Sequence, residues 1–216
     1  MATVVLDVDG TLVDTNYHHT VCWARAFESV GVTVPLWRIH RAIGMGGDKL
    51  VGAVAGDRVD EQQGDEVRER WEKEYDAVID EVRLLPGAKD LLAALRDRDV
   101  DVALASSSIP KHAERAFELL DADDLADTAT TSEDAEESKP DPELVETALA
   151  RVGADAACVV GDSVWDVEAA HRAGLPAYGV LTGGTSRAEL EEAGARAVFR
   201  DAAELLERLD EWVPKG

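Results

Sequence analysis

The chain has 216 residues and a formal net charge of −23, because 45 acidic residues stand against 22 basic ones. This length predicts one well-buried core and a smaller accessory unit. The charge excludes binding to nucleic acid or to an anionic membrane by bulk electrostatics, so an anionic ligand would need a local basic pocket.

The chain opens with an apolar strand, expected at 3–8, that runs into Asp7-Val8-Asp9-Gly10-Thr11. Residues i and i+2 share a strand face, and the backbone turns at Gly10, so Asp7 and Asp9 are expected to reach one pocket from different sides. Two buried, unpartnered carboxylates cost several kcal/mol, which predicts a divalent cation or a lysine beside them. An Asx turn or a helix cap is the alternative for an isolated motif of this kind.

Residues 15–83 lack convincing strands and carry a helical periodicity at Val67, Trp71, Tyr75 and Val78, which predicts an inserted helical domain. Residues 84–216 instead alternate strands and helices, typical of a parallel sheet covered on both faces. Beyond the opening strand, strands are expected at 100–106, 127–131, 156–161, 176–181 and 196–199, and helices at 87–98, 110–120, 141–152, 165–173, 186–194 and 201–211.

Three further segments place polar side chains after a strand or beside a turn, where open α/β sheets bind their ligands. The strand at 100–106 ends in Ser106, whose hydroxyl could hold a phosphoryl oxygen. Two prolines stiffen the backbone after Lys139, and a positioned ammonium neutralises a charged nucleophile or phosphate. Asp162 and Asp166 follow the strand at 156–161 on the first turn of a helix, and hard oxygen ligands in a turn suit Mg²⁺.

With these four segments in order, the chain resembles the haloacid dehalogenase superfamily of phosphotransferases that form an aspartyl phosphate. The sequence Asp7-Val8-Asp9-Gly10-Thr11 is similar to the first family motif, Ser106 to the second, Lys139 to the third and the segment 161–166 to the fourth. The resemblance implies an α/β fold with a Rossmann-like core formed by residues 1–14 and 84–216. It also implies a helical cap, residues 15–83, that is hinged near residues 14 and 84–87 and closes over the site.

The resemblance also implies a role for each motif residue. Asp7 would attack phosphorus, and Asp9 would protonate the leaving oxygen and then activate water. Ser106 and Lys139 would hold the phosphoryl group. Mg²⁺ would be held by Asp7, the backbone carbonyl of Asp9 and Asp162, with Asp166 either a ligand through water or an outer anchor. The charges agree with this assignment, because a carboxylate that attacks a phosphate dianion meets repulsion that metal and ammonium must cancel.

His19 and Trp23 lie four residues apart, so they share a helix face. A histidine at the boundary of cap and core, satisfied by structural hydrogen bonds, is the alternative to a substrate role. Beta-phosphoglucomutases carry a His and a Trp at these positions, which favours His19 lining the site. Thr11, in the first motif, and Ser107, beside the second, are further candidates for substrate contact.

The segment 42–50 resembles the cap specificity loop of the family, and Gly44 and Gly47 would let its backbone approach a ligand closely. A flexible connection between helices is the alternative. The sugar-phosphate mutases carry Lys and Arg where this loop has Ile43 and Gly47, and a mutase must bind a second phosphate, so the loss favours a plain phosphatase. Lys49 and Arg41 are the candidate substitutes for contact with a distal anionic group.

The sequence therefore predicts a Mg²⁺-dependent phosphatase that acts on a small phosphorylated metabolite, a phosphoglycolate or a sugar phosphate. A phosphomutase of the beta-phosphoglucomutase type is the first alternative. Asp9 and the metal site argue against a C–Cl dehalogenase. A phosphonate C–P hydrolase needs a cap lysine, for which Lys49 is the only candidate in the loop, and Asp9 again argues against it. A catalytically retired binding module is a last alternative, although all four motifs keep their key residues.

Other features of the sequence concern redox state, cellular location and habitat rather than catalysis. Cys22 and Cys158 are not expected to form a disulfide or a thiol catalyst. The catalytic strand begins at the N-terminus and no apolar run reaches ~18 residues, so a cytoplasmic monomer or homodimer that binds no membrane or nucleic acid is expected. The acidic composition, with only six lysines, predicts a halophilic habitat. At 1 M salt the Debye length is ~3 Å, so repulsion between surface carboxylates is screened. An ordinary acidic surface is the alternative.

Some polar and aromatic residues have a simpler explanation than a binding role. The acidic run at 133–137 is expected to be a solvated loop. Histidines 40, 112 and 171 are expected to be solvated or to cap helices, and tryptophans 37, 71 and 212 to lie in the core or at its boundary.

Overall fold

The computed structural model describes residues 2–153 and 156–215. Its centre is a six-stranded sheet in the order β3-β2-β1-β4-β5-β6, with every pair parallel. The strands are β1 (Ala2–Asp7), β2 (Asp101–Ala105), β3 (Thr128–Thr130), β4 (Ala156–Gly161), β5 (Ala177–Val180) and β6 (Val198–Phe199). Each lies within one or two residues of its predicted range, and the α/β prediction is confirmed.

Helices cover both faces of the sheet and bury β1 on both sides. The core helices are α5 (Ala88–Arg96), α6 (Pro110–Leu120), α7 (Ala122–Leu125), α8 (Glu143–Val152), α9 (Val164–Arg172), α10 (Arg187–Ala193), α11 (Ala202–Glu207) and α12 (Leu209–Trp212), with short 3-10 turns η2 (Ser132–Asp134) and η3 (Leu181–Gly183). On one face, Val4 and Leu6 pack with Leu91 of α5 and Leu205 of α11. On the other, Val5 packs in a cluster with residues of α8, α9 and α10.

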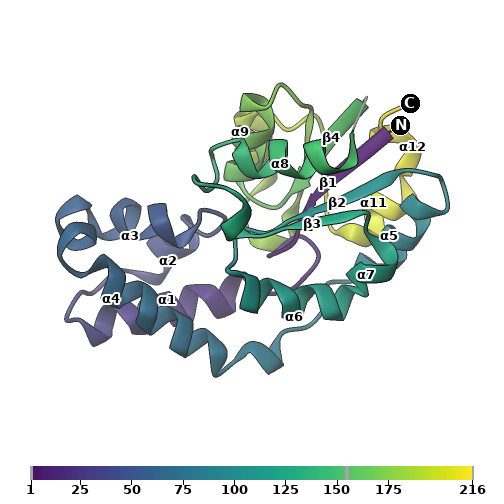
Figure 1. The fold of residues 1–216 in the computed structure, drawn as a ribbon. Coiled ribbons are helices and arrows are strands. Elements are labelled where there is room, and N and C mark those ends of the chain that lie inside the picture. The colour runs from purple at the N-terminus through teal and green to yellow at the C-terminus, as the bar shows by residue number, and fades with distance from the viewer. Residues whose placement is uncertain (1, 154–155, 216) are drawn as a thin grey trace.

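A second unit of helices lies beyond the carboxyl ends of the strands, while both termini lie at the opposite side of the core (Figure 1). It consists of α1 (Asn16–Ser29), α2 (Leu36–His40), α3 (Gly47–Ala55), α4 (Asp57–Asp76) and the 3-10 turn η1 (Ile79–Glu81). The chain leaves and re-enters the core side by side, since Val13 bridges to Leu84. We call residues 15–83 the cap.

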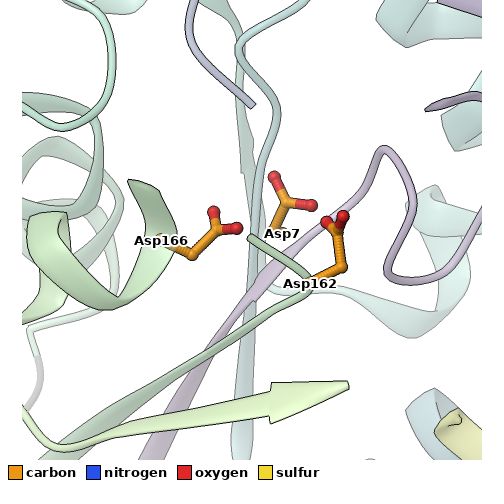
Figure 2. Close-up of side chains that lie close together, drawn as sticks. All are labelled: Asp7, Asp162 and Asp166. Atoms are coloured by element: carbon orange, nitrogen blue, oxygen red, sulfur yellow. The ribbon is translucent and has the colours of Figure 1, made fainter. Parts of the chain in front are cut away.

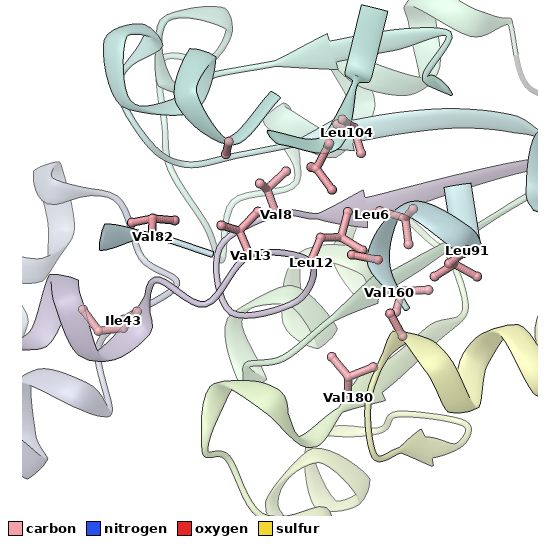
Figure 3. Close-up of a cluster of buried hydrophobic side chains, with 14 of the residues drawn as sticks. Leu6, Val8, Leu12, Val13, Ile43, Val82, Leu91, Leu104, Val160 and Val180 are labelled. Atoms are coloured by element: carbon pink, nitrogen blue, oxygen red, sulfur yellow. The ribbon is translucent and has the colours of Figure 1, made fainter. Parts of the chain in front are cut away.

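One continuous apolar cluster joins the two units. Figure 3 shows it running from Leu6 of β1 through Val8, Leu12 and Val13 of the connecting loop towards Val82, and all of these side chains are buried. The loop between Asp7 and Asp14 has a defined conformation, because its apolar side chains are packed between the core and the cap.

The structure corrects four details. The helix predicted at 201–211 is two helices, broken at Arg208, whose φ of −122° is not helical. The one-turn helix α7 was not predicted, because four residues are too few to show a period. Trp37 is 69% exposed rather than in the core or at its boundary. His112 is buried rather than solvated, since Nε2 bonds to Asp76 of the cap at 2.9 Å.

Other predictions are confirmed: Trp71 and Trp212 are buried, and His171 is exposed. Cys22 and Cys158 are buried, free thiols on different elements. No helix in the described part of the chain combines the length and the apolar character required to cross a bilayer.

Candidate active site

Strand register brings the four motifs to one edge of the sheet. Asp7, the last residue of β1, lies opposite Ala105, the last residue of β2, so that Ser106 follows immediately beside it. On the other side β1 pairs with β4, whose end leads into Asp162. Strands that are parallel and in register end together, which is why segments far apart in sequence converge here.

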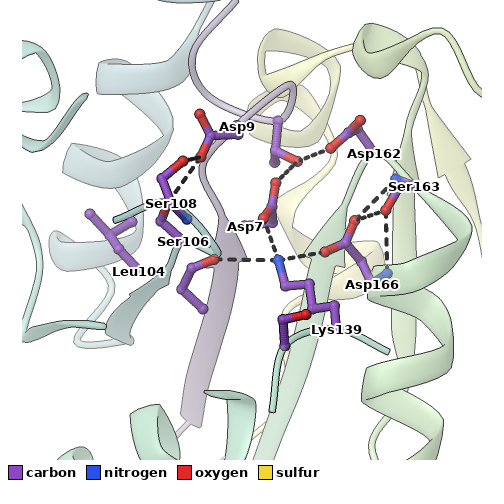
Figure 4. A network of polar contacts seen from close by, with 12 residues as sticks. Asp7, Asp9, Leu104, Ser106, Ser108, Lys139, Asp162, Ser163 and Asp166 are labelled. Atoms are coloured by element: carbon purple, nitrogen blue, oxygen red, sulfur yellow. Dashed lines mark hydrogen bonds and ion pairs between the residues drawn. The ribbon is translucent and has the colours of Figure 1, made fainter. Parts of the chain in front are cut away.

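Asp7 and Lys139 form the centre of this polar group (Figure 4). Both side chains are buried, and the Lys139 ammonium is bonded to Asp7 Oδ1 and lies 2.8 Å from Asp166 Oδ1. Burial disfavours the ammonium, but the carboxylates of Asp166 and Asp7 outweigh it and raise the pKa of Lys139. Burial, reinforced by the charges of Asp166 and Asp162, raises the pKa of Asp7 well above its usual value in spite of Lys139.

Thr11 connects two of the carboxylates. Its hydroxyl lies 2.9 Å from Asp7 Oδ2 and 3.1 Å from Asp162 Oδ1. Thr11 is fully buried and, unlike Asp7, does not line the cavity described below. The residue that was expected to contact substrate therefore lies underneath the acidic group and orients it. Asn16 of α1 supports Asp162 in the same way, with Nδ2 2.8 Å from Asp162 Oδ2.

Asp9 has a different environment, formed by hydrogen-bond donors. The hydroxyls of Ser106 and Ser108 donate to its Oδ2 at 2.9 and 3.0 Å, and His19 Nε2 lies 3.5 Å from Oδ1. Burial alone would raise the pKa of Asp9, but bonds from His19, Thr15 and Ser106 outweigh it and hold that pKa well below the usual range. The two aspartates of the first motif thus have opposite shifts, which is the pattern expected of two carboxylates with two roles.

Three carboxylates could hold a metal ion. Asp7, Asp162 and Asp166 each place one oxygen within 4.8 Å of the others, and their side chains converge from β1 and from the segment after β4 (Figure 2). Burial, followed by the charge of Asp166, raises the pKa of Asp162 to about 7. Asp166 also closes the N-terminus of α9, because its Oδ2 accepts from the backbone N and hydroxyl of Ser163 at 3.1 and 2.6 Å.

The charges of this group fit a divalent cation. Among the described residues, three buried carboxylates face the ammonium of Lys139, so about two negative charges are uncompensated when all three are ionised. Oxygen-only ligands of this kind suit Mg²⁺.

A small cavity of about 50 Å³ lies directly above Asp7 and Asp9, and we call it the inner cavity. Among the residues expected to contact substrate, His19, Gly44, Gly47 and Ser107 line it. Gly44 has φ +102°, and a Cβ there would lie 2.7 Å from Ser163 Oγ, so only glycine fits between cap and core. The Ser107 hydroxyl is buried and has no hydrogen-bond partner among the described residues.

Lys49 does not line the inner cavity. Its ammonium donates to the carbonyl of Ser138 at 2.6 Å and pairs with Glu137 at 3.0 Å. The backbone N–H of Gly46 donates to Ser138 Oγ at 3.0 Å. These contacts join the cap loop to the core loop that carries Lys139. Arg41 likewise faces the core, where it pairs with Glu189.

Sequence reasoning missed three contributors. Ser108 was not among the predicted site residues, yet its hydroxyl donates to Asp9. Asn16 gave no signal beyond its place after the first motif. Trp71 was assigned to the core or its boundary, and it is buried but also lines the inner cavity. Its period of four with Val67 and Tyr75 indicated a helix face and could not show that this face meets the site.

Comparison with known proteins identifies the class. A family model described as haloacid dehalogenase-like hydrolase matches residues 1–174. The chain belongs to this family. It is an enzyme of the hydrolase type, and its relatives named as phosphatases support a phosphoric monoester hydrolase.

Three similar proteins each cover more than nine tenths of this chain. The Beta-phosphoglucomutase of Bacillus subtilis is 27% identical and covers 98% of this chain and 96% of its own. A Phosphoglycolate phosphatase of Caulobacter vibrioides is 29% identical over 92% of this chain and 86% of its own. The crystal structure of a hydrolase from Pseudomonas syringae is 31% identical, with a TM-score of 0.93 and coverage of 99% of this chain and 100% of that one. The chain is thus similar to both phosphatases and a phosphomutase.

Proposed function

We propose that this protein is a Mg²⁺-dependent phosphatase that hydrolyses a small phosphorylated metabolite through a phospho-aspartate on Asp7. The observation that carries the proposal is the position of Asp7, which lines the inner cavity and is bonded to Lys139 and Thr11. Phosphoglycolate and sugar phosphates are the substrate classes that the names of the relatives support.

In the first step an Asp7 carboxylate oxygen attacks phosphorus, and the bond from phosphorus to the leaving oxygen breaks. Asp9 gives its proton to that oxygen. In the second step Asp9 takes a proton from water, the water oxygen attacks phosphorus, and the bond to Asp7 breaks, which releases phosphate. Lys139 stays protonated throughout and opposes the charge on Asp7 and on the phosphoryl oxygens.

The environment of Asp9 suits the second step, because its hydrogen bonds stabilise the carboxylate that acts as base. Proton donation in the first step needs the opposite state. A phosphoryl dianion would place negative charge beside Asp9 and compete for the hydroxyls of Ser106 and Ser108, and both effects raise the pKa of Asp9. Substrate binding would therefore favour the protonated form of Asp9, which acts as the acid in the first step.

Asp7, Asp162 and Asp166, with the backbone carbonyl of Asp9, are the groups proposed to hold Mg²⁺. When bound, Mg²⁺ supplies positive charge that offsets the repulsion between the nucleophile and the phosphate. Asp166 would serve mainly as an outer anchor of the Mg²⁺ site rather than as a direct ligand, since its two oxygens already contact Lys139 and Ser163.

The test is phosphate release from a panel of phosphomonoesters, including 2-phosphoglycolate and hexose phosphates, with Mg²⁺ and with EDTA. We expect Mg²⁺-dependent release that disappears in Asp7→Asn. Asp123→Asn on α7, an exposed and remote aspartate, is the matched control and should retain activity. A folded wild-type protein that releases no phosphate from any member would refute the proposal.

A phosphomutase remains the second candidate, because one relative carries that name. Against it, the described residues that line the inner cavity include no Lys or Arg to hold a second phosphate. Conversion of β-glucose 1-phosphate to glucose 6-phosphate faster than phosphate release would favour the mutase.

A further inference from the structure

A second, larger cavity of about 340 Å³ continues from the inner one between cap and core. We call it the outer cavity. The two share Trp23, Gly47, Trp71 and Ser107 in their linings. The inner cavity is the smaller of the two and is lined by Asp7, the proposed nucleophile, so the phosphoryl group would lie there. On the proposed function, on which this inference rests, the leaving group of the substrate must therefore occupy the outer cavity.

The charged side chains around the outer cavity are mostly acidic. Five carboxylates line it against one guanidinium, that of Arg68: they belong to Asp48, Glu69, Glu72, Glu136 and Glu137. Arg68 is already engaged, with Nε 2.8 Å from the Gly47 carbonyl and Nη1 3.2 Å from Asp65. Among residues 2–153 and 156–215, no basic side chain forms an ion pair with the carboxylate of Glu69 or Glu136. A carboxylate or second phosphate on the leaving group would meet repulsion here.

Two tryptophans line both cavities, and two of the residues shared by the cavities contain a buried donor without a partner in the described part of the chain. The rings of Trp23 and Trp71 stack with centroids 4.8 Å apart. Trp71 Nε1 and Ser107 Oγ are both buried and have no hydrogen-bond partner among the described residues. An indole N–H only donates, so a ligand that satisfies it must bring an acceptor oxygen. The carboxylates that line the outer cavity, conversely, accept hydrogen bonds from hydroxyl groups.

We infer that the leaving group is an uncharged polyhydroxylated ring, so that the substrate is a sugar monophosphate without a second acidic group, and that Trp71 is a specificity-determining residue that donates to one of its oxygens. Hydroxyl groups both donate and accept, and a sugar ring presents an apolar face to the tryptophans. This combination fits neither glycolate nor a bisphosphate.

The experiment compares kcat/KM for glucose 6-phosphate, 2-phosphoglycolate and fructose 1,6-bisphosphate at low ionic strength with saturating Mg²⁺, using p-nitrophenyl phosphate to report the hydrolytic step alone. We expect glucose 6-phosphate to exceed each anionic competitor at least tenfold. The ratio should shrink as KCl is raised, because Glu69 and Glu136 are solvent-exposed and salt screens their charges. In Glu69→Gln/Glu136→Gln the ratio should fall at least threefold, through a gain on 2-phosphoglycolate.

Trp71→Phe keeps the ring and removes the N–H, and it should raise KM for glucose 6-phosphate at least fivefold. Trp37→Phe on the exposed face of α2 is the matched control and should change nothing. Should Trp71→Phe fail to fold, the glutamate variant still decides the charge argument. If 2-phosphoglycolate matches or exceeds glucose 6-phosphate, the inference is wrong while the phosphatase proposal stands. If p-nitrophenyl phosphate and every metabolite are inert, both fail.

Discussion

Replacement of the proposed nucleophile by its neutral isostere should have opposite effects on catalysis and on stability. In Asp7→Asn the side chain keeps its shape but loses its charge, so it can no longer attack phosphorus. We expect kcat to fall at least ~10³-fold, as for other essential nucleophiles. At the same time the metal-free protein should become more stable, because one of three mutually repelling buried carboxylates has been neutralised.

The size of the stability gain follows from the charges around Asp7. In the described part of the chain, Lys139 forms ion pairs with Asp7 and Asp166, and Asp162 lies beside them. Burial and the neighbouring acids raise the pKa of Asp7 well above its usual value, so ionised Asp7 lowers the stability of the folded protein at neutral pH. Lys139 keeps its pair with Asp166 at 2.8 Å in the variant. We therefore expect a gain in the free energy of unfolding on the order of 1 kcal/mol, within the range of single substitutions.

The assay is urea unfolding at pH 7.5 in EDTA and again in saturating Mg²⁺, beside phosphate release. The variant should be the more stable protein in EDTA and should gain less from Mg²⁺, because it offers one charge fewer to the ion. Asp123→Asn should match the wild type in both media. A variant that is less stable than the wild type in EDTA would refute the charge argument, and a variant that retains turnover would refute the assignment of the nucleophile.

Three further predictions concern the metal, pH and salt. Mg²⁺ at a hundred times its Kd should stabilise the protein by about 2.7 kcal/mol; thermal unfolding of Asp162→Asn should show most of this shift lost, and an undiminished shift would place the ion elsewhere. Burial opposes ionisation of Asp76, but Lys111 and His112 outweigh it and lower the pKa of Asp76, so the stability from this contact between cap and core is present above its unfolded pKa near 3.9 and is lost as pH falls through the lower folded value. Asp76→Asn should therefore cost ~1 kcal/mol in urea unfolding at pH 7 and progressively less below pH 4; a constant cost would contradict this. With a net charge of −23, Tm should rise by several degrees between 0.1 and 2 M KCl as repulsion is screened, whereas a flat or falling Tm in calorimetry would argue against the halophilic interpretation.

The predicted strands and most predicted helices agree with the structure because their signals are local. Short, apolar and β-branched runs such as residues 3–6 and 157–160 favour buried strands, and polar residues directly after such strands are expected at the carboxyl edge of a parallel sheet. The proximity of Asp7, Ser106, Lys139 and Asp162 was thus expected from the order of the motifs. The break in the last helix at Arg208 was not, because nothing in its composition interrupts the helical pattern.

The partners of these residues depend on contacts between the two units, which no local period encodes. His112 carries the same local signal as His171, yet one is buried against Asp76 of the cap and the other is exposed. Trp37 and Trp71 are both helical tryptophans, and only the packing of α1 on α4 decides that Trp71 lines the site. Lys49 was a candidate for an anion, but the loop after residue 131 offers it Ser138 and Glu137 instead.

The α/β core, the helical insertion and the four groups of residues at the strand ends could be predicted from the sequence alone, since each rests on the burial of nearby apolar side chains. The contacts of Thr11 with Asp7 and Asp162, the donors around Asp9 and the lining of the space for a leaving group became evident only in the folded protein. Those features are distances between side chains of elements that lie far apart in the chain, and such distances are set when the cap packs on the core.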